Sequence, residues 1–205
     1  YHQPSQPELQ KQAGDQRNYF SALACNHYNR YEEDFDIVKS LNQNAHRFSI
    51  EWSRIEPEEG VFNQKEIEHY RKVVKALRVR GIEPFVTLWH YTHPVWFNKQ
   101  GGWIGPKAKS HFLRYVEKIV SELKEDVKYW ITENEPETVA RTGYLLGTRP
   151  PHKKNIFKAF KALDAMVGVH NEAYDLIHSI DPDARVGCSE SLVFFESYNN
   201  WPHNL

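Results

Sequence analysis

Residues 63–90 read NQKEIEHYRKVVKALRVRGIEPFVTLWH, and this stretch predicts a helix followed directly by a buried strand. Asn63 is a suitable N-cap, Glu66 stands at the capping-box position, and Gly81 supplies the C′ residue. Between them an apolar stripe repeats every three or four residues, at Ile67, Tyr70, Val73, Val74 and Leu77. The short apolar run 82–88 then predicts a strand.

The same alternation continues on both sides of this unit. Helices are expected over 31–41, 64–80 and 155–180 and after Pro106, with strands over 45–51, 82–88, 128–135 and 184–189. Strands separated by helices favour an α/β fold with a parallel sheet, either an open doubly wound sheet or an arc of a barrel. No glycine-rich turn follows a strand, which disfavours a nucleotide-binding doubly wound protein.

Two further segments carry expectations of their own. Residues 1–27 are polar and aperiodic, and we expect an irregular N-terminal segment there. The helix over 155–180 is expected to turn most of its large apolar residues inward: Phe157, Phe160, Leu163, Met166, Val167, Tyr174 and Ile177.

Composition excludes several classes of partner. The 205 residues carry 26 Lys and Arg against 27 Asp and Glu, a net charge of −1, so neither nucleic acid nor an anionic membrane surface is expected to bind. No stretch approaches the roughly 18 apolar residues of a membrane span. The aromatic content of 14% suits stacking on sugars, although it also suits a large core.

The two cysteines help to predict where in the cell the protein is located. Cys25 and Cys188 lie far apart and outside any metal-ligand spacing, so neither a disulfide framework nor a zinc site is expected. The N-terminal residues lack the pattern of a signal peptide. We therefore predict a cytoplasmic protein.

Polar residues stand at or near the ends of the first two predicted strands. Arg47 interrupts an apolar run, and its guanidinium is either a member of a structural ion pair or placed to keep a catalytic carboxylate ionised. His90 and Tyr91 follow the second strand and could contact sugar hydroxyls, although His90 could equally be satisfied by the backbone. His90 and His93 have no nearby carboxylate to complete a metal site, so no metal is expected.

The third strand carries the main chemical signal, YWITENEPE at residues 129–137. Pro136 stops the strand, which leaves Asn134 and Glu135 at the rim of the sheet. A carboxylic acid walled by aromatics there would have a raised pKa and could donate a proton to a leaving oxygen. The alternative is a solvated acidic loop made of Glu133, Glu135 and Glu137.

Asn134-Glu135-Pro136 after an aromatic strand resembles the acid/base motif of family 1 glycoside hydrolases, the retaining β-glucosidases and β-glycosidases. Further segments resemble that family in the same order: Tyr31-Glu32-Glu33-Asp34, Arg47-Phe48-Ser49-Ile50, Trp52-Ser53-Arg54, Gly81-Ile82-Glu83-Pro84, Gly101-Gly102-Trp103, Gly143-Tyr144 and Pro150-Pro151. The resemblance implies a (β/α)8 TIM barrel. Residues 28–205 would be its N-terminal half, with about four βα units that contain the second to fifth strands.

The resemblance also implies a role for each candidate residue. Glu135 would be the general acid/base, and Asn134 and His90 would hold sugar hydroxyls. Tyr91 would line the sugar site, and Arg47 would lie beside the nucleophile. The chain departs from the family at Glu133, where the family usually has an apolar residue. A first barrel strand is not recognisable in residues 1–27, and the strand bearing the nucleophile would lie beyond residue 205.

These features lead to a first hypothesis, a hydrolase that cleaves terminal β-linked glucose or similar sugars by a retaining double displacement. No cofactor is required. A β-glycoside would be the substrate, and the remaining C-terminal barrel strands or a complementary fragment would be a necessary partner. The 205 residues alone are expected to be inactive, because retaining hydrolysis needs a second carboxylate. The alternative is a non-catalytic half-barrel that binds carbohydrate or protein.

Overall fold

The structure is a computed structural model that describes residues 24–191 of the chain. Its sheet has four strands: β1 (Ala45–Ser49), β2 (Glu83–Trp89), β3 (Tyr129–Asn134) and β4 (Arg185–Ser189). The strands are adjacent in sequence order, and each neighbouring pair is parallel. The pairing of β3 with β4 shifts register between Ile131 and Asn134. All four predicted strands are therefore confirmed.

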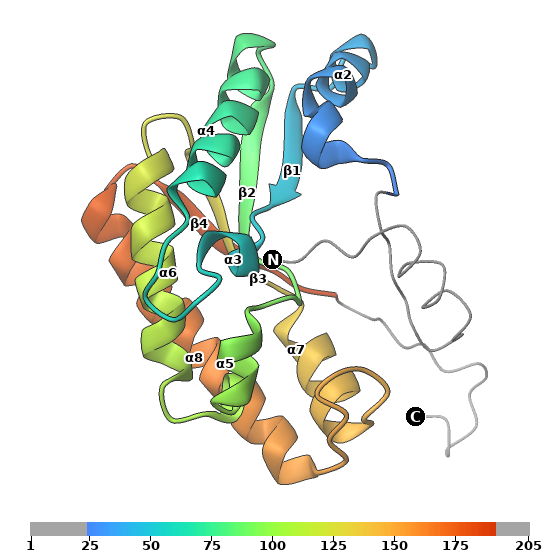
Figure 1. Cartoon of the computed structure of the whole chain (residues 1–205), viewed down its shortest axis with the longest axis vertical. Helices are drawn as coiled ribbons and strands as arrows, with labels where there is room; N and C mark the ends of the chain where they lie inside the picture. The colour runs from blue at the N-terminus through green and yellow to red at the C-terminus, as the bar shows by residue number, and fades with distance from the viewer. Residues whose placement is uncertain (1–23, 192–205) are drawn as a thin grey trace, which may run out of the picture.

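Four long helices accompany the strands: α2 (His27–Ser40), α4 (Gln64–Val79), α6 (Ala108–Leu123) and α8 (Ile156–Ile180). Figure 1 shows α4, α6 and α8 along one side of the sheet. A doubly wound sheet reverses its strand order and has helices on both faces, whereas a barrel keeps the order and covers one face. The arrangement is therefore an arc of a barrel.

The end signals of α4 are confirmed in part. The Asn63 side chain accepts hydrogen bonds from the backbone N–H groups of Lys65 (3.1 Å) and Glu66 (3.4 Å), and Gly81 adopts a left-handed φ of 68°. The capping box, however, is not closed. The Glu66 carboxylate instead accepts a hydrogen bond from the Tyr28 hydroxyl at 3.0 Å, because α2 packs against this end of α4.

The inward face of α8 differs from the prediction. Met166 and Ile177 are buried, but Phe157 is 81% and Phe160 65% exposed, and Val167 and Tyr174 also lie outside. The buried face is made mostly of small residues: Ala159, Ala162, Met166, Val169, Ala173 and Ile177. Small side chains let α8 approach α6 and the sheet closely, so the larger apolar residues form an uncovered outer face.

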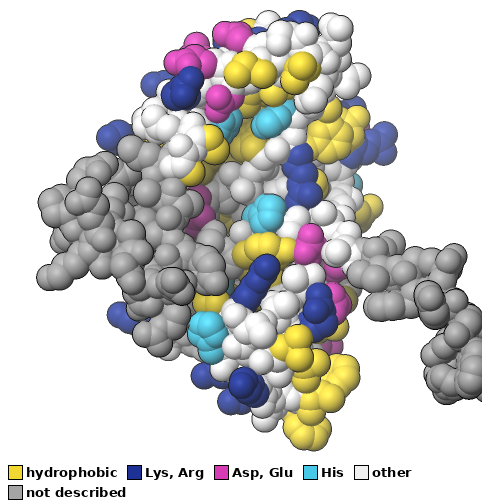
Figure 2. All heavy atoms as spheres, turned by 90° about the vertical axis from the view of Figure 1, so that its right-hand side faces the viewer, with side chains coloured by type: hydrophobic (Ala, Val, Ile, Leu, Met, Phe, Trp, Pro, Cys, Tyr) yellow, Lys and Arg dark blue, Asp and Glu magenta, His cyan; other side chains and the backbone are white. Residues whose placement is uncertain are grey.

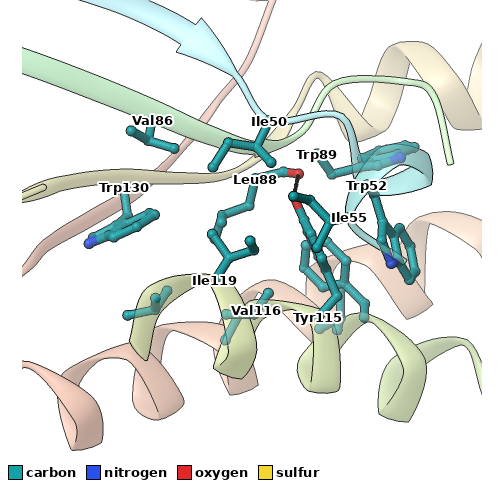
Figure 3. Close-up of a cluster of buried hydrophobic side chains, with 14 of the residues drawn as sticks. Ile50, Trp52, Ile55, Val86, Leu88, Trp89, Tyr115, Val116, Ile119 and Trp130 are labelled. Atoms are coloured by element: carbon teal, nitrogen blue, oxygen red, sulfur yellow. Dashed lines mark hydrogen bonds between the residues drawn. The ribbon is translucent and has the colours of Figure 1, made fainter. Parts of the chain in front are cut away.

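The core lies between the sheet and these helices. Figure 3 shows Ile50, Leu88 and Trp130 from the sheet side facing Val116 and Ile119 from α6. The Tyr115 hydroxyl of α6 donates a hydrogen bond of 2.9 Å to the backbone carbonyl of Leu88, which is drawn as a dashed line. This packing fixes the end of β2, and with it the position of the residues that follow.

Short helices that the sequence analysis did not predict occupy the connections after β1, β2 and β3. They are α3 (Trp52–Ile55), α5 (Val95–Lys99), η1 (Gly102–Ile104), α7 (Pro136–Val139) and η2 (Ala140–Leu145). Helix α2 begins at His27, and residues 1–23 of the predicted irregular segment lie outside the described residues. Within residues 24–191 no helix is long and apolar enough to cross a bilayer.

Candidate active site

The carboxyl ends of the four strands bring the predicted site residues to one edge of the sheet. Figure 2 views the molecule from the right-hand side of Figure 1, on which histidine, basic and acidic side chains gather among hydrophobic ones along the middle of the face. In barrel enzymes this end of the strands carries the chemistry. The structure places Arg47, His90, Tyr91, Asn134 and Glu135 there together.

Arg47 connects the strands of the sheet. Its guanidinium donates hydrogen bonds to the side-chain oxygens of Thr87 on β2 (2.9 Å), Asn134 on β3 (2.6 Å) and Ser189 on β4 (3.1 Å). Neither predicted role is shown, since these partners are neutral acceptors and no carboxylate among residues 24–191 forms an ion pair with Arg47. The rigid planar fork of an arginine suits several fixed acceptors, and lysine could not reproduce it.

Asn134 belongs to this network, and His90 lies near the charge of Arg47. Asn134 is buried and its carbonyl oxygen is held by Arg47, so the orientation of the amide is fixed. Burial lowers the pKa of His90, with a further lowering from the charge of Arg47. His90 is therefore neutral at neutral pH, with one ring nitrogen that donates and one that accepts, which is a suitable set for sugar hydroxyls.

Glu135 sits at the turn between β3 and α7. Its backbone is left-handed (φ 49°, ψ 58°), and its N–H donates a hydrogen bond of 2.6 Å to the Ser189 carbonyl. A left-handed conformation is costly for a residue with a side chain, and it persists only where neighbours hold it. Pro136 begins the next helix. The strand thus ends at Asn134, one residue before the predicted end, and a sharp turn directs Glu135 away from it.

Tyr91 holds the Glu135 carboxylate directly. Its hydroxyl donates a hydrogen bond of 2.5 Å to Glu135 Oε2, and its own backbone is left-handed with φ 73°. Burial, and then this hydrogen bond, raise the pKa of Tyr91 to about 12. The hydrogen bond from Tyr91 is also the main cause that lowers the pKa of Glu135.

The lowered pKa of Glu135 corrects the expectation of a raised one. The sequence analysis placed the carboxylic acid among aromatic walls, but in the structure the Glu135 side chain is only half-buried and its aromatic neighbour is a hydrogen-bond donor. Donors to a carboxylate stabilise its ionised form. At neutral pH the Glu135 of this chain is therefore ionised, and its protonation requires a change that raises its pKa, such as burial or a further negative charge.

Glu133 lies inside the fold and not on a solvated loop. Its side chain is 0% exposed, and neither carboxylate oxygen has a hydrogen-bond partner among residues 24–191. Burial raises the pKa of Glu133 well above its ordinary value, with a smaller contribution from Glu190. The acidic-loop alternative is therefore wrong for Glu133, and it fits only Glu137, which is exposed and paired with Arg141 at 3.1 Å.

The chemistry available at this edge is proton transfer and hydrogen bonding. Among residues 24–191 no group of three or more His, Cys, Asp or Glu side chains could hold a metal ion. Sequence reasoning missed Thr87 and Ser189, the partners of Arg47, and Thr138, whose hydroxyl also stabilises the Glu135 carboxylate. Thr87 and Ser189 occupy positions in predicted strands, but small hydroxyl residues carry no signal of their own there.

Comparison with known proteins agrees with this geometry. A family model described as glycosyl hydrolase family 1 matches residues 7–203. The chain belongs to this family. Among family 1 relatives, Beta-glucosidase A of Thermotoga maritima is 36% identical over 85% of this chain and 39% of the relative. Beta-glucosidase 40 of Arabidopsis thaliana is 38% identical over 77% of this chain and 31% of the relative.

Solved family 1 structures confirm the predicted barrel. The β-glucosidase from Thermotoga maritima in complex with deoxynojirimycin superimposes with a TM-score of 0.83 at 35% identity, covering 86% of this chain and 41% of that one. A second structure of the same family 1 enzyme gives a TM-score of 0.84 at 34% identity, over 88% and 40%. The chain thus spans about two fifths of the length of these relatives, and its sheet is part of a TIM barrel.

Proposed function

We propose that this chain is the N-terminal part of a hydrolase that cleaves terminal β-linked glucose or a similar sugar by a retaining mechanism. The observation that carries the proposal is the position of Glu135, which lies at the carboxyl end of β3, next to Asn134 and hydrogen-bonded to Tyr91. The β-glucosidases among the relatives support it, as does the structure of one of them with deoxynojirimycin.

In this proposal Glu135 acts twice. It first protonates the glycosidic oxygen while a second carboxylate, roughly 5 Å away, attacks the anomeric carbon; it then takes a proton from the water that releases the sugar. The second carboxylate is expected outside this chain segment. Its negative charge would raise the pKa of Glu135, and this would reverse the lowering that Tyr91 causes in the chain by itself.

The other site residues bind the sugar. Asn134 presents an amide whose orientation Arg47 fixes, and neutral His90 offers one donor and one acceptor. The ring of Tyr91 lies 5.0 Å from that of His90, so an aromatic face and a hydroxyl-binding group stand together. Hydrogen bonds that tighten as positive charge develops on the sugar would lower the barrier.

Two surfaces support the proposed partner, the remaining barrel strands. β4 ends the order of strands in the described part of the chain, so its outer edge has no described strand beside it. The outer face of α8 exposes Phe157, Phe160, Val167 and Tyr174. An unpaired strand edge and an uncovered apolar face are what the next βα unit of a barrel would cover.

The uncovered face of α8 equally favours the alternative, a non-catalytic half-barrel that binds another protein or a carbohydrate. The two hypotheses differ in their need for Glu135. A binding half-barrel would tolerate its replacement, whereas a glycosidase would not.

A cytoplasmic location remains part of the proposal. The thiols of Cys25 and Cys188 are both free, which suits a reducing compartment. Recovery of the native protein from the extracellular medium, rather than from the cytosolic fraction, would contradict this location.

The experiment that tests the function is Glu135→Gln in the complete enzyme. The amide cannot donate a proton, so hydrolysis of cellobiose should be abolished, while the first step on a dinitrophenyl β-glucoside should be largely spared. Glu137→Gln, two residues away and exposed, is the matched control and should leave both rates unchanged. Cellobiose hydrolysis at the parental rate by Glu135→Gln would refute the assignment.

A further inference from the structure

A pocket of about 320 Å³ opens beside Tyr91. Its walls come from three separate parts of the chain: the segment after β2, the helix η1, and the stretch from Val139 at the end of α7 through η2 to the loop that follows. Tyr91, Trp103, Thr142, Tyr144 and Arg149 are among the lining residues. A volume of this order suits a small organic group. Because the hydroxyl of Tyr91 binds Glu135, one side chain separates the pocket from the acid.

The walls of the pocket are flat and largely apolar. Trp103 and Tyr144, at 1% and 3% exposed, form the buried base of the wall. Tyr91, Val139, Pro150 and Pro151 form its accessible apolar surface. The indole N–H of Trp103 is buried and has no hydrogen-bond partner among residues 24–191. The Nδ1 atom of His93, another lining residue, is also buried and has no partner there. Because these two nitrogens are shielded from solvent, the apolar surface that a ligand can reach is that of Tyr91, Val139 and the two prolines.

Arg149 supplies the charge of this pocket. No Asp or Glu is among the described residues that line it, and burial lowers the pKa of His93 to about 4, so His93 is neutral at neutral pH. The guanidinium of Arg149 lies 5.9 Å from the centre of the Tyr91 ring, and no described carboxylate forms an ion pair with it. Arg141, on η2, is by contrast paired with Glu137. A cation above an aromatic wall, with no counter-ion in the described part of the chain, suits an anionic group on an aromatic ligand.

We propose that this pocket binds the leaving-group end of the substrate, an aromatic aglycone that carries a carboxylate, and that Arg149 determines this specificity. The inference rests on the proposed function, because the leaving oxygen must lie within reach of Glu135. The aromatic ring lies against Tyr91 and the two prolines, and its carboxylate meets Arg149. Figure 2 shows basic side chains lying against hydrophobic ones on this face of the molecule.

The hydrolysis test uses two glucosides of nearly equal size on the complete enzyme, 4-carboxyphenyl and 4-carbamoylphenyl β-glucoside. The ratio of their kcat/KM values measures the preference for the negative charge. The parent should favour the carboxylate, and Arg149→Gln should lower the ratio about tenfold, in line with the strength of a charge-assisted hydrogen bond. Arg141→Gln is the matched control, since it removes an arginine that is already paired, and it should leave the ratio unchanged.

A binding test separates this inference from the proposed function. Binding of free 4-hydroxybenzoate and 4-hydroxybenzamide is followed by tryptophan fluorescence, because Trp103 lines the pocket. Binding of the acid should be tighter and should weaken about tenfold in Arg149→Gln. Arg149-dependent binding without hydrolysis of either glucoside would support the ligand class and refute the proposed function. Hydrolysis of both glucosides with a ratio that Arg149→Gln does not change would overturn the inference and leave the proposed function standing.

Discussion

Replacing Glu133 by Leu should stabilise the protein at neutral pH. The Glu133 carboxyl is fully buried, and neither of its oxygens has a hydrogen-bond partner among the described residues. Both oxygens are shielded from solvent, so added barrel strands could not reach them without rearranging the fold. Leu has a similar volume and needs no hydrogen bond, and the family usually has an apolar residue at this position.

The size of the effect follows from the raised pKa of Glu133. Protonating an ordinary Glu of pKa about 4.3 at pH 7 costs roughly 3.7 kcal/mol, and this is the upper limit of the pH-dependent penalty. The folded protein binds the proton more tightly than the unfolded chain does, because burial raises the pKa. The penalty is therefore absent below about pH 4 and grows as the pH rises above the unfolded pKa. We expect a gain of about 2 to 3 kcal/mol at pH 7.

Urea denaturation of the complete protein and of Glu133→Leu, at several values between pH 4 and pH 8, measures this gain. The difference in unfolding free energy should increase with pH. Glu137→Gln, an exposed neighbour, is the control and should change stability by less than about 0.5 kcal/mol. A Glu133→Leu variant that is no more stable than the parent at pH 7, or whose gain is the same at every pH, would refute the argument.

Two further predictions concern the site. Asn134→Ala and His90→Ala should each raise the barrier measured by kcat/KM by on the order of 2 to 4 kcal/mol, because their contacts tighten in the transition state. The melting temperature should barely move for the exposed His90, whereas Asn134→Ala should also lower it, because the hydrogen bond from Arg47 is lost. Steady-state kinetics and thermal melts measure both, and a large loss of stability with unchanged kinetics would indicate structural roles. Tyr91→Phe removes the donor that lowers the pKa of Glu135, so that pKa should rise and the alkaline limb of the kcat/KM profile should move to higher pH; a limb that does not move, or moves to lower pH, would show that Tyr91 does not tune the acid.

Much of the fold could be predicted because local signals and tertiary packing agree. Helix α4 has a capping residue, an apolar stripe and a C′ glycine, and all three serve the roles expected from the sequence. Pro136 ends β3 because its ring fixes φ and removes a donor, which placed Asn134 and Glu135 at the rim. These arguments need only the residue types and their spacing.

The errors arise where the outcome depends on neighbours distant in sequence. Helix α8 is apolar on two faces, and only the packing against α6 and the sheet decides which face is buried. Glu66 fits a capping box, but Tyr28 of another helix takes its carboxylate. The pKa of Glu135 depends on one hydroxyl, that of Tyr91, whose position follows from its own left-handed backbone. No local pattern contains this information.

Trapping the glycosyl-enzyme tests the central claim most directly, since it separates the acid/base from the nucleophile. The complete enzyme is treated with a 2-fluoro β-glucoside that carries an activated leaving group, and the labelled peptide is identified by mass spectrometry. Our account predicts a covalent adduct on a carboxylate outside residues 1–205, with Glu135 unlabelled. An adduct on Glu135, or on any other carboxylate of this chain, would contradict it.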